Sequence, residues 1–359
     1  MAMRALTLQV FISLFLYSFA RFAVLNQFVV SERPYTYLSS QITEDHLYLF
    51  ADKNFDHIFL KVDLETSTVT HTQHFDNYVI RNLAPFFDIP GDKMYFIYLY
   101  LLQTQYRISS FNLKDLSYEK NSTFDVTFYN GVGLLNSYMK SIYIPEEDFP
   151  MGNQLKQVHL SNFTDTGRIV NLDEFGVVLK KYQKYGEPII YAIAFHQDIH
   201  LNILDFSIIK YDLVDLKVIK SWTTKDPSLY AYTSCFVPGG KYLGLGLGAP
   251  NVPTGVALFD LESFNVEKQF SVMSTFNQKS YPTILSSNGK DMYFTTSNRD
   301  LEHRDCMVWK VSLSNFTVNN AEHVYTQDKK GICNVVMLES NNRGSYFATD
   351  LGRSVFHTN

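Results

Sequence analysis

A short pattern of alternating hydrophobic and polar residues, closed by a polar residue and a leucine, recurs along this chain. It is clearest at 58–64, 208–213, 256–261 and 308–313. The residue before the leucine lies at 63, 112, 159, 212, 260 and 312, so successive copies stand 47 to 53 residues apart. Alternation with a period of two predicts strands, and the regular spacing predicts a repeat architecture.

Each copy is preceded by a second strand that follows a tight turn. The turns read Pro-Gly-Asp-Lys at 90–93, Pro-Gly-Gly-Lys at 238–241 and Asn-Gly-Lys at 288–290, and glycine supplies the positive φ that such hairpins need. A short apolar strand lies upstream of the turn, and a more polar strand lies downstream of the leucine. Four short strands in each unit of about fifty residues predict an all-β propeller with four-stranded blades.

The ends of the chain predict seven blades and the way in which the ring closes. A seventh copy of the pattern ends at Asn359, 47 residues after Ser312, and no fourth strand follows it. The segment 24–30 is identical at four of seven positions to 266–272, the fourth strand of the fifth blade. We therefore expect this N-terminal strand to complete the last blade, which removes two open sheet edges.

The first twenty residues have the features of a secretory signal peptide. Arg4 precedes an apolar run over 5–19, and Ala20 offers a small residue for cleavage. The alternative is an uncleaved anchor helix, but the run is shorter than the roughly 20 residues that span a bilayer. We expect a signal peptide at 1–20, one propeller domain at 21–359, secretion to the extracellular space and no stable membrane span.

Secretion agrees with three glycosylation sequons and bears on three cysteines. The sequons begin at Asn121, Asn162 and Asn315, and the last two share the turn Leu-Ser-Asn-Phe-Thr after the strand pattern. Both should therefore be exposed on one face of the propeller. Cys306 and Cys333 fall on one face of adjacent blades and form the expected disulfide, with Cys235 a buried thiol. Three unpaired thiols remain the alternative.

The blades resemble those of YVTN-type and quinoprotein-like seven-bladed propellers. The resemblance rests on the Pro-Gly-Lys turn, the Met-Tyr-Phe strand and the Ile-x-Lys-x-Asp-Leu strand, and it implies the architecture alone. The repeated tryptophan contacts of quinone-dependent dehydrogenases cannot be built from Trp222 and Trp309, so we expect no cofactor. The net charge of −5 is spread along the chain without a basic run, so we expect no nucleic-acid partner.

Two loops carry the candidate ligand-binding residues, and both connect the second and third strands of a blade. Such loops emerge at the mouth of the central channel, which we call the mouth face. Carboxylates in these loops are able to hold Ca²⁺, although solvated loops are the simpler alternative. The candidates are His196, Asp198 and His200 in the fourth blade and Glu302, His303 and Asp305 in the sixth.

The glycines at 244, 246 and 248 lie inside a predicted strand, where they would face one side of the sheet. We interpret them as sites where a neighbouring blade packs closely.

These features favour a secreted binding module over an enzyme. The leading hypothesis is a protein that holds a protein, peptide or glycan ligand at the mouth face. The alternative is a lactonase-like hydrolase, assisted by Ca²⁺, that uses Asp and His of the same loops. No residue is assigned a catalytic role, because no nucleophile motif occurs in the sequence.

Overall fold

The computed structural model describes residues 24–29, 36–53, 56–75, 85–99, 106–124, 134–146, 154–183, 186–198, 200, 202–249, 252–271, 282–297, 306–324, 335–349 and 354–358. Their regular elements are strands β1 to β28 and two 3₁₀ helices, η1 (Asp173–Phe175) and η2 (Pro227–Leu229). Among these residues, no helix has the length and hydrophobicity needed to cross a membrane.

The described strands form seven four-stranded antiparallel sheets. The first contains β2 (Thr36–Ile42), β3 (His46–Lys53), β4 (Asp56–Asp63) and β5 (Thr68–Phe75). The second contains β6 (Phe86–Asp88), β7 (Lys93–Leu99), β8 (Tyr106–Asn112) and β9 (Tyr118–Phe124). The third contains β10 (Leu134–Asn136), β11 (Ser141–Glu146), β12 (Gln154–His159) and β13 (Thr164–Asn171).

The remaining sheets repeat this order. The fourth contains β14 (Val177–Gln183), β15 (Ile189–Gln197), β16 (Ile203–Asp212) and β17 (Lys217–Thr224). The fifth contains β18 (Ala231–Phe236), β19 (Tyr242–Ala249), β20 (Val252–Asp260) and β21 (Asn265–Ser271). The sixth contains β22 (Pro282–Ser287), β23 (Asp291–Ser297), β24 (Cys306–Ser312) and β25 (Val318–Val324). The closing sheet contains β26 (Val335–Asn341), β27 (Gly344–Thr349), β28 (Ser354–Thr358) and β1 (Val24–Val29).

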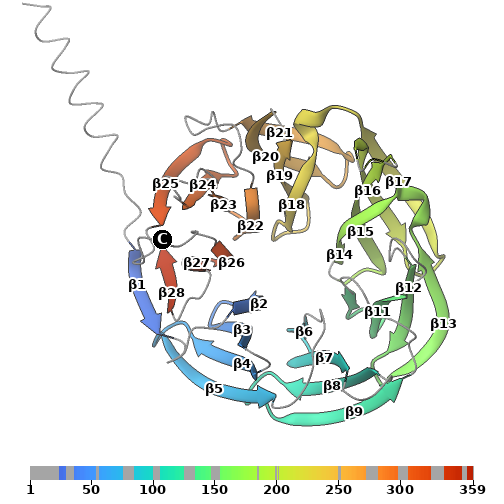
Figure 1. The fold of residues 1–359 in the computed structure, drawn as a ribbon, viewed down its shortest axis with the longest axis vertical. Helices are drawn as coiled ribbons and strands as arrows, with labels where there is room; N and C mark the ends of the chain where they lie inside the picture. The colour runs from blue at the N-terminus through green and yellow to red at the C-terminus, as the bar shows by residue number, and fades with distance from the viewer. Residues whose placement is uncertain are drawn as a thin grey trace, which may run out of the picture.

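The sheets stand as repeated blades around a central axis, with the first strand of each near the axis and the fourth on the rim (Figure 1). This arrangement confirms the prediction of an all-β propeller. Because neighbouring strands are antiparallel, the turns between strands one and two and between strands three and four share one end of each blade. We call this end the turn face; it lies opposite the mouth face.

The N-terminal strand pairs with the C-terminal strand. In β1 and β28, Phe28 lies opposite Val355 and Val29 opposite Ser354, in antiparallel register. The predicted pairing is therefore confirmed, and Figure 1 shows β1 on the rim of the closing sheet. β1 and β28 meet here because β26 to β28 supply three strands of a sheet whose fourth is β1.

One buried position repeats through the second strands and organises the packing between blades. In the first six sheets it is the second residue after the one that pairs with the last residue of strand three, and in the closing sheet it is the first. It is occupied by Tyr48, Tyr95, Tyr143, Tyr191, Gly244, Tyr293 and Tyr346. All six tyrosines are buried. Burial raises the pKa of each phenol, to about 12 for Tyr48, Tyr95, Tyr143 and Tyr191.

Gly244 breaks this row because no side chain fits there. A Cβ at Gly244 would lie 2.7 Å from Met292 Sδ and 3.1 Å from Cys235 Sγ. Met292 belongs to the sixth sheet, so the close packing of a neighbouring blade expected at this glycine is confirmed. Cys235 is buried and is not in a disulfide.

Candidate ligand-binding site

The repeated tyrosine has a cross-strand partner on the third strand, and that partner is short in the second sheet. The partners are Lys61, Ser110, Gln157, Lys210, Leu258, Lys310 and His357. Two lysine ammonium groups lie over the facing rings, Lys61 at 5.9 Å from Tyr48 and Lys310 at 5.6 Å from Tyr293. Ser110 lacks the length to cover Tyr95 in this way.

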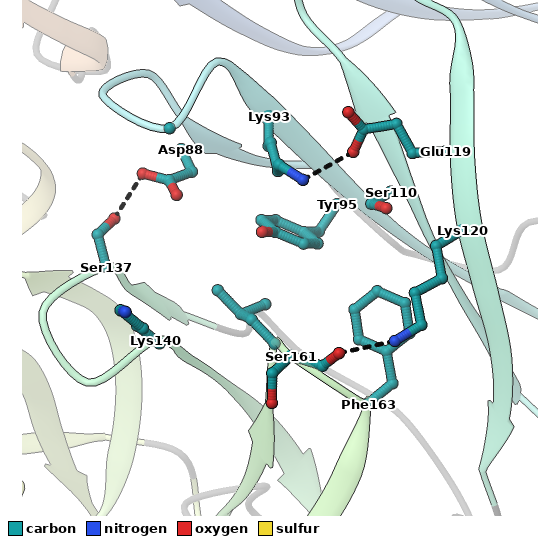
Figure 2. Close-up of a pocket in the computed structure, with 12 residues that line it drawn as sticks. Asp88, Lys93, Tyr95, Ser110, Glu119, Lys120, Ser137, Lys140, Ser161 and Phe163 are labelled. Atoms are coloured by element: carbon teal, nitrogen blue, oxygen red, sulfur yellow. Dashed lines mark hydrogen bonds and ion pairs between the residues drawn. The ribbon is translucent and has the colours of Figure 1, made fainter.

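A cavity of about 570 Å³ lies on this side of the second sheet, toward the third sheet. We call it the polar cavity, and Figure 2 shows its lining. It lies on the turn face, because the turns at 89–92, 137–140 and 160–163 contribute to it. Its lining residues are Asp88, Gly91, Lys93, Tyr95, Ser110, Glu119, Lys120, Ser137, Lys140, Leu160, Ser161 and Phe163.

Two rings and a lysine form one wall of the polar cavity. Phe163 meets Tyr95 edge to face, with ring centroids 6.2 Å apart. The ammonium of Lys120 lies 5.0 Å from the Phe163 centroid and donates to the carbonyl of Ser161 at 2.7 Å. Between the fourth and fifth sheets, Lys220 makes the same two contacts, with the Phe264 ring and the Ser263 carbonyl. The Lys120 contacts are therefore part of the blade-to-blade packing.

Two further polar pairs lie on the opposite side of the opening. Lys93 and Glu119 form an ion pair at 2.9 Å. Ser137 donates a hydrogen bond to Asp88 Oδ1 at 2.9 Å and so links the second and third sheets. Gly91 lies against Asp88, and a Cβ there would lie 2.5 Å from Asp88 Oδ2, so a larger residue would displace this carboxylate. This glycine therefore lets the turn fold over the carboxylate.

Tyr95 as a whole is only 5% exposed, but its hydroxyl opens into the cavity and has no hydrogen-bond partner among the described residues. Figure 2 shows the ring in the middle of the cavity, with the hydroxyl directed to the side where Asp88 and Ser137 lie. Burial and the carboxylates of Asp88 and Glu119 raise the pKa of this phenol to about 12. The group therefore stays neutral and keeps its proton for donation.

Of the three lysines of this cavity, Lys140 is the one whose ammonium has neither a carboxylate nor a carbonyl partner in the described part of the chain. It is exposed and has a φ of 47° in the turn between β10 and β11. By contrast, Lys93 is paired with Glu119 and Lys120 is held by the Ser161 carbonyl. An anionic group entering the cavity would meet Lys140 as an available partner.

A second cavity of about 430 Å³ lies on the other side of the second sheet, toward the first. Ser109 lies there, since successive strand residues face opposite sides, and its Oγ is 3.2 Å from the Tyr98 hydroxyl. Aromatic side chains dominate the lining, which consists of Gln73, His74, Phe75, Phe96, Tyr98, Arg107, Ser109, Phe111, Tyr118 and Asn121. The dipeptide Ser109-Ser110 thus borders a cavity on each side of one sheet.

The loop predicted to bind a ligand in the fourth blade is engaged by its own neighbours. Both ring nitrogens of His196 face acceptors, Asp205 Oδ1 and the Glu174 carbonyl, each at 2.8 Å. Burial lowers the pKa of His196, but these hydrogen bonds outweigh it and the net shift is upward. A doubly protonated ring has no lone pair for a metal ion.

Asp198 closes the loop on itself. Its Oδ1 accepts from the backbone N–H groups of His200 and Asn202, and its Oδ2 accepts from the Asn202 side chain. These hydrogen bonds from Asn202 lower the pKa of Asp198. Within the described ranges, no group of three or more His, Cys, Asp and Glu residues is placed to hold a metal ion.

Several predicted site residues lie outside the described residues. These are Glu302, His303 and Asp305 of the sixth blade and Cys333 of the expected disulfide with Cys306. The ligand-binding role of both mouth-face loops and the disulfide therefore stay predictions.

The three sequon asparagines are all exposed. In the two that share a turn, the Asn side-chain oxygen accepts from the hydroxyl two residues on, Asn162 from Thr164 and Asn315 from Thr317, each at 2.8 Å. Their exposure on the turn face agrees with the expected register. Their glycosylation stays a prediction.

Comparison with known proteins supports the fold and goes no further. No protein-family model matches the chain, and no curated protein matches it. Among solved structures, 678 chains match, so the architecture is widely shared. One is hydrazine synthase of Kuenenia stuttgartiensis, which is 12% identical with a TM-score of 0.60 and covers 92% of this chain and 97% of that one. At this identity the likeness shows a β-propeller fold alone.

Proposed function

We propose that this chain is a secreted binding module, built as a seven-bladed ring closed by its N-terminal strand, that holds a small polar ligand in the polar cavity. The observation that carries the proposal is the cavity itself, into which the Tyr95 hydroxyl opens without a hydrogen-bond partner among the described residues, beside three lysines and two carboxylates. A ligand with hydrogen-bonding groups would satisfy this hydroxyl. Secretion is supported by the apolar run at 5–19 and the exposed sequons.

The packing of the other blades supports a functional reason for this opening. Lysine stands at the position of Ser110 in three blades and glutamine in a fourth, so a longer side chain is compatible with the repeat. The short Ser110 leaves this space unfilled, which does not favour stability. Concave sites of 300–1,000 Å³ with a few convergent polar groups are typical of small-molecule binding.

The mouth-face ligand and the Ca²⁺-assisted lactonase-like hydrolase remain predictions that depend on the loop at 298–305. The contacts of the described residues favour the polar cavity instead, since His196 and Asp198 are engaged within the protein.

The proposal is tested with the secreted protein and a mixed set of small carbohydrates, sugar acids and amino acids, with saturation-transfer NMR as the readout. The wild type should bind at least one compound, and Ser110→Lys should lose that binding because its side chain fills the cavity. Ser221→Lys, an exposed change on β17, should bind as the wild type does. Absence of any binding, or equal binding by Ser110→Lys, would contradict the proposal.

A further inference from the structure

The charges of the polar cavity are not balanced within the cavity itself. Three lysines face two carboxylates, and one lysine–carboxylate pair, Lys93 with Glu119, is already closed at 2.9 Å. The other carboxylate, Asp88, accepts from Ser137, and Lys120 donates to a backbone carbonyl. Lys120 and Lys140 both lack an ion pair in the described part of the chain, and Lys140 also lacks a carbonyl partner there. One anionic group in the ligand would restore the balance.

The neutral polar groups around this position favour a ligand that is rich in hydroxyls. The Tyr95 phenol keeps its proton, because burial and two nearby carboxylates raise its pKa. Asp88 and Ser137 stand on the same side of the cavity, and Ser161 is exposed at its edge (Figure 2). A carboxylate, a phenol and two serine hydroxyls offer both acceptors and donors, as a polyhydroxyl ligand requires.

The aromatic wall favours a ring with an apolar face. The Tyr95 ring lines the cavity, and no lysine covers it as Lys61 covers Tyr48. Sugar rings present C–H groups on one face and hydroxyls around their edge, so they combine contact with an aromatic ring and hydrogen bonding. A cationic ligand is disfavoured by Lys120 and Lys140. A dianionic phosphate is disfavoured by Asp88 and Glu119 on the facing side.

We infer that the polar cavity is selective for a sugar acid, a mono- or disaccharide that carries one carboxylate, with the carboxylate at Lys140, the ring against Tyr95 and the hydroxyls at Asp88 and Ser137. This inference rests on the proposed function of the same cavity. It adds the chemical class of the ligand and assigns Lys140 as the residue that determines specificity.

The test compares D-glucuronate, D-glucose and D-glucose 6-phosphate by calorimetry on the secreted wild-type protein. Glucuronate should bind at least about tenfold more tightly than glucose, as expected for a charge-assisted hydrogen bond. Lys140→Met, an exposed change that leaves the core intact, should bring glucuronate affinity down to about that of glucose. Tyr95→Phe should weaken both sugars.

The remaining outcomes separate the two proposals. Equal affinity of the wild type for glucuronate and glucose would overturn the inference, and so would tighter binding of the phosphate or undiminished glucuronate binding by Lys140→Met. If no sugar binds, but another compound binds the wild type and not Ser110→Lys, the inference fails and the proposed function stands. If Ser110→Lys binds glucuronate as the wild type does, the site lies elsewhere and both fail.

Discussion

Two interfaces between neighbouring blades, which we call seams, differ in how their polar groups are used. The closing seam, between the closing sheet and the first sheet, joins segments about 300 residues apart through polar contacts. Asn341 donates to the Thr43 carbonyl at 2.9 Å, and Ser40 donates to Glu339 at 2.6 Å. The seam between the second and third sheets also carries polar groups, but these surround a space of about 570 Å³.

The difference shows where polar groups serve closure and where they are available to a ligand. In the closing seam each of these side chains points to a partner across the seam, so the contacts stabilise the ring. At the polar cavity, the Tyr95 hydroxyl and the Lys140 ammonium have no side-chain partner among the described residues, and the short Ser110 leaves the Tyr95 ring uncovered. Mutations in the closing seam, whose polar groups pair with one another, should lower the free energy of unfolding. Mutations at the polar cavity should mainly lower the affinity for a ligand.

The largest effect on stability is expected from Asn341→Ala in the closing seam. Asn341 is 6% exposed, donates to the Thr43 carbonyl and accepts from the Arg343 backbone N–H at 2.9 Å. Its loss removes two hydrogen bonds of a buried side chain and should reduce the free energy of unfolding by about 2–3 kcal/mol. Urea unfolding followed by tyrosine fluorescence measures the change.

The adjacent residue provides the control for this variant. Asn342 is exposed and donates to Glu44 at 2.8 Å, so Asn342→Ala should change the free energy of unfolding by no more than about 0.5 kcal/mol. Equal effects of the two variants would show that the closing seam does not depend on its buried polar contacts.

A smaller and pH-dependent effect is expected from Glu339 in the same seam. Burial raises the pKa of this carboxyl to about 7, against a lowering contribution from the Ser40 hydrogen bond. The folded-state pKa is above the unfolded value of 4.5, so the folded protein binds this proton more tightly, and the resulting stabilisation is complete below pH 4.5. The contribution is lost as the pH rises toward 7, and it is on the order of 1–3 kcal/mol because the side chain keeps partial contact with solvent.

The difference in unfolding free energy between wild type and Glu339→Gln isolates this group from the other carboxylates. Relative to the variant, the wild type should lose stability between pH 4.5 and 7 and change little above pH 8. A constant difference across that range would show that Glu339 is not buried at the seam as described.

The smallest effect is expected from Lys93→Met beside the polar cavity. Lys93 and Glu119 form their ion pair at 2.9 Å with side chains 42% and 28% exposed, and such pairs contribute about 0–1 kcal/mol, less at high salt. Unfolding at 0.05 M and 1 M salt should therefore differ little between wild type and variant. A loss of unfolding free energy close to that of Asn341→Ala would mean that polar pairs also stabilise the contact between the second and third sheets.

Much of the fold was predictable because it follows from short sequence patterns that repeat from blade to blade. Period-two strands, the turns at 90–93 and 238–241 and the likeness of 24–30 to 266–272 each reflect a requirement of a single blade, repeated. Gly244 was interpretable for the same reason, since a glycine within a strand points to a close neighbour. These inferences need no knowledge of how distant segments meet.

The polar cavity was missed, although part of its signal is present in the sequence. Ser110 stands two residues before the end of its strand, where other blades have Lys61, Lys210 or Lys310, and an alignment of the repeats shows the difference. The approach of Ser137 to Asp88, 49 residues apart, depends on how two blades pack. Conversely, the spacing of His196 and His200 suggested a ligand site, but Asp205 and the Glu174 carbonyl already occupy the ring nitrogens of His196.

Thermal unfolding of wild type and Ser110→Lys, each with and without glucuronate, tests most directly the claim that the second blade is open for a ligand. Without ligand, Ser110→Lys should be as stable as the wild type or more stable, because lysine faces the repeated tyrosine in three other blades. With ligand, only the wild type should shift to a higher Tm. A markedly destabilised variant, or equal shifts in both proteins, would contradict the account.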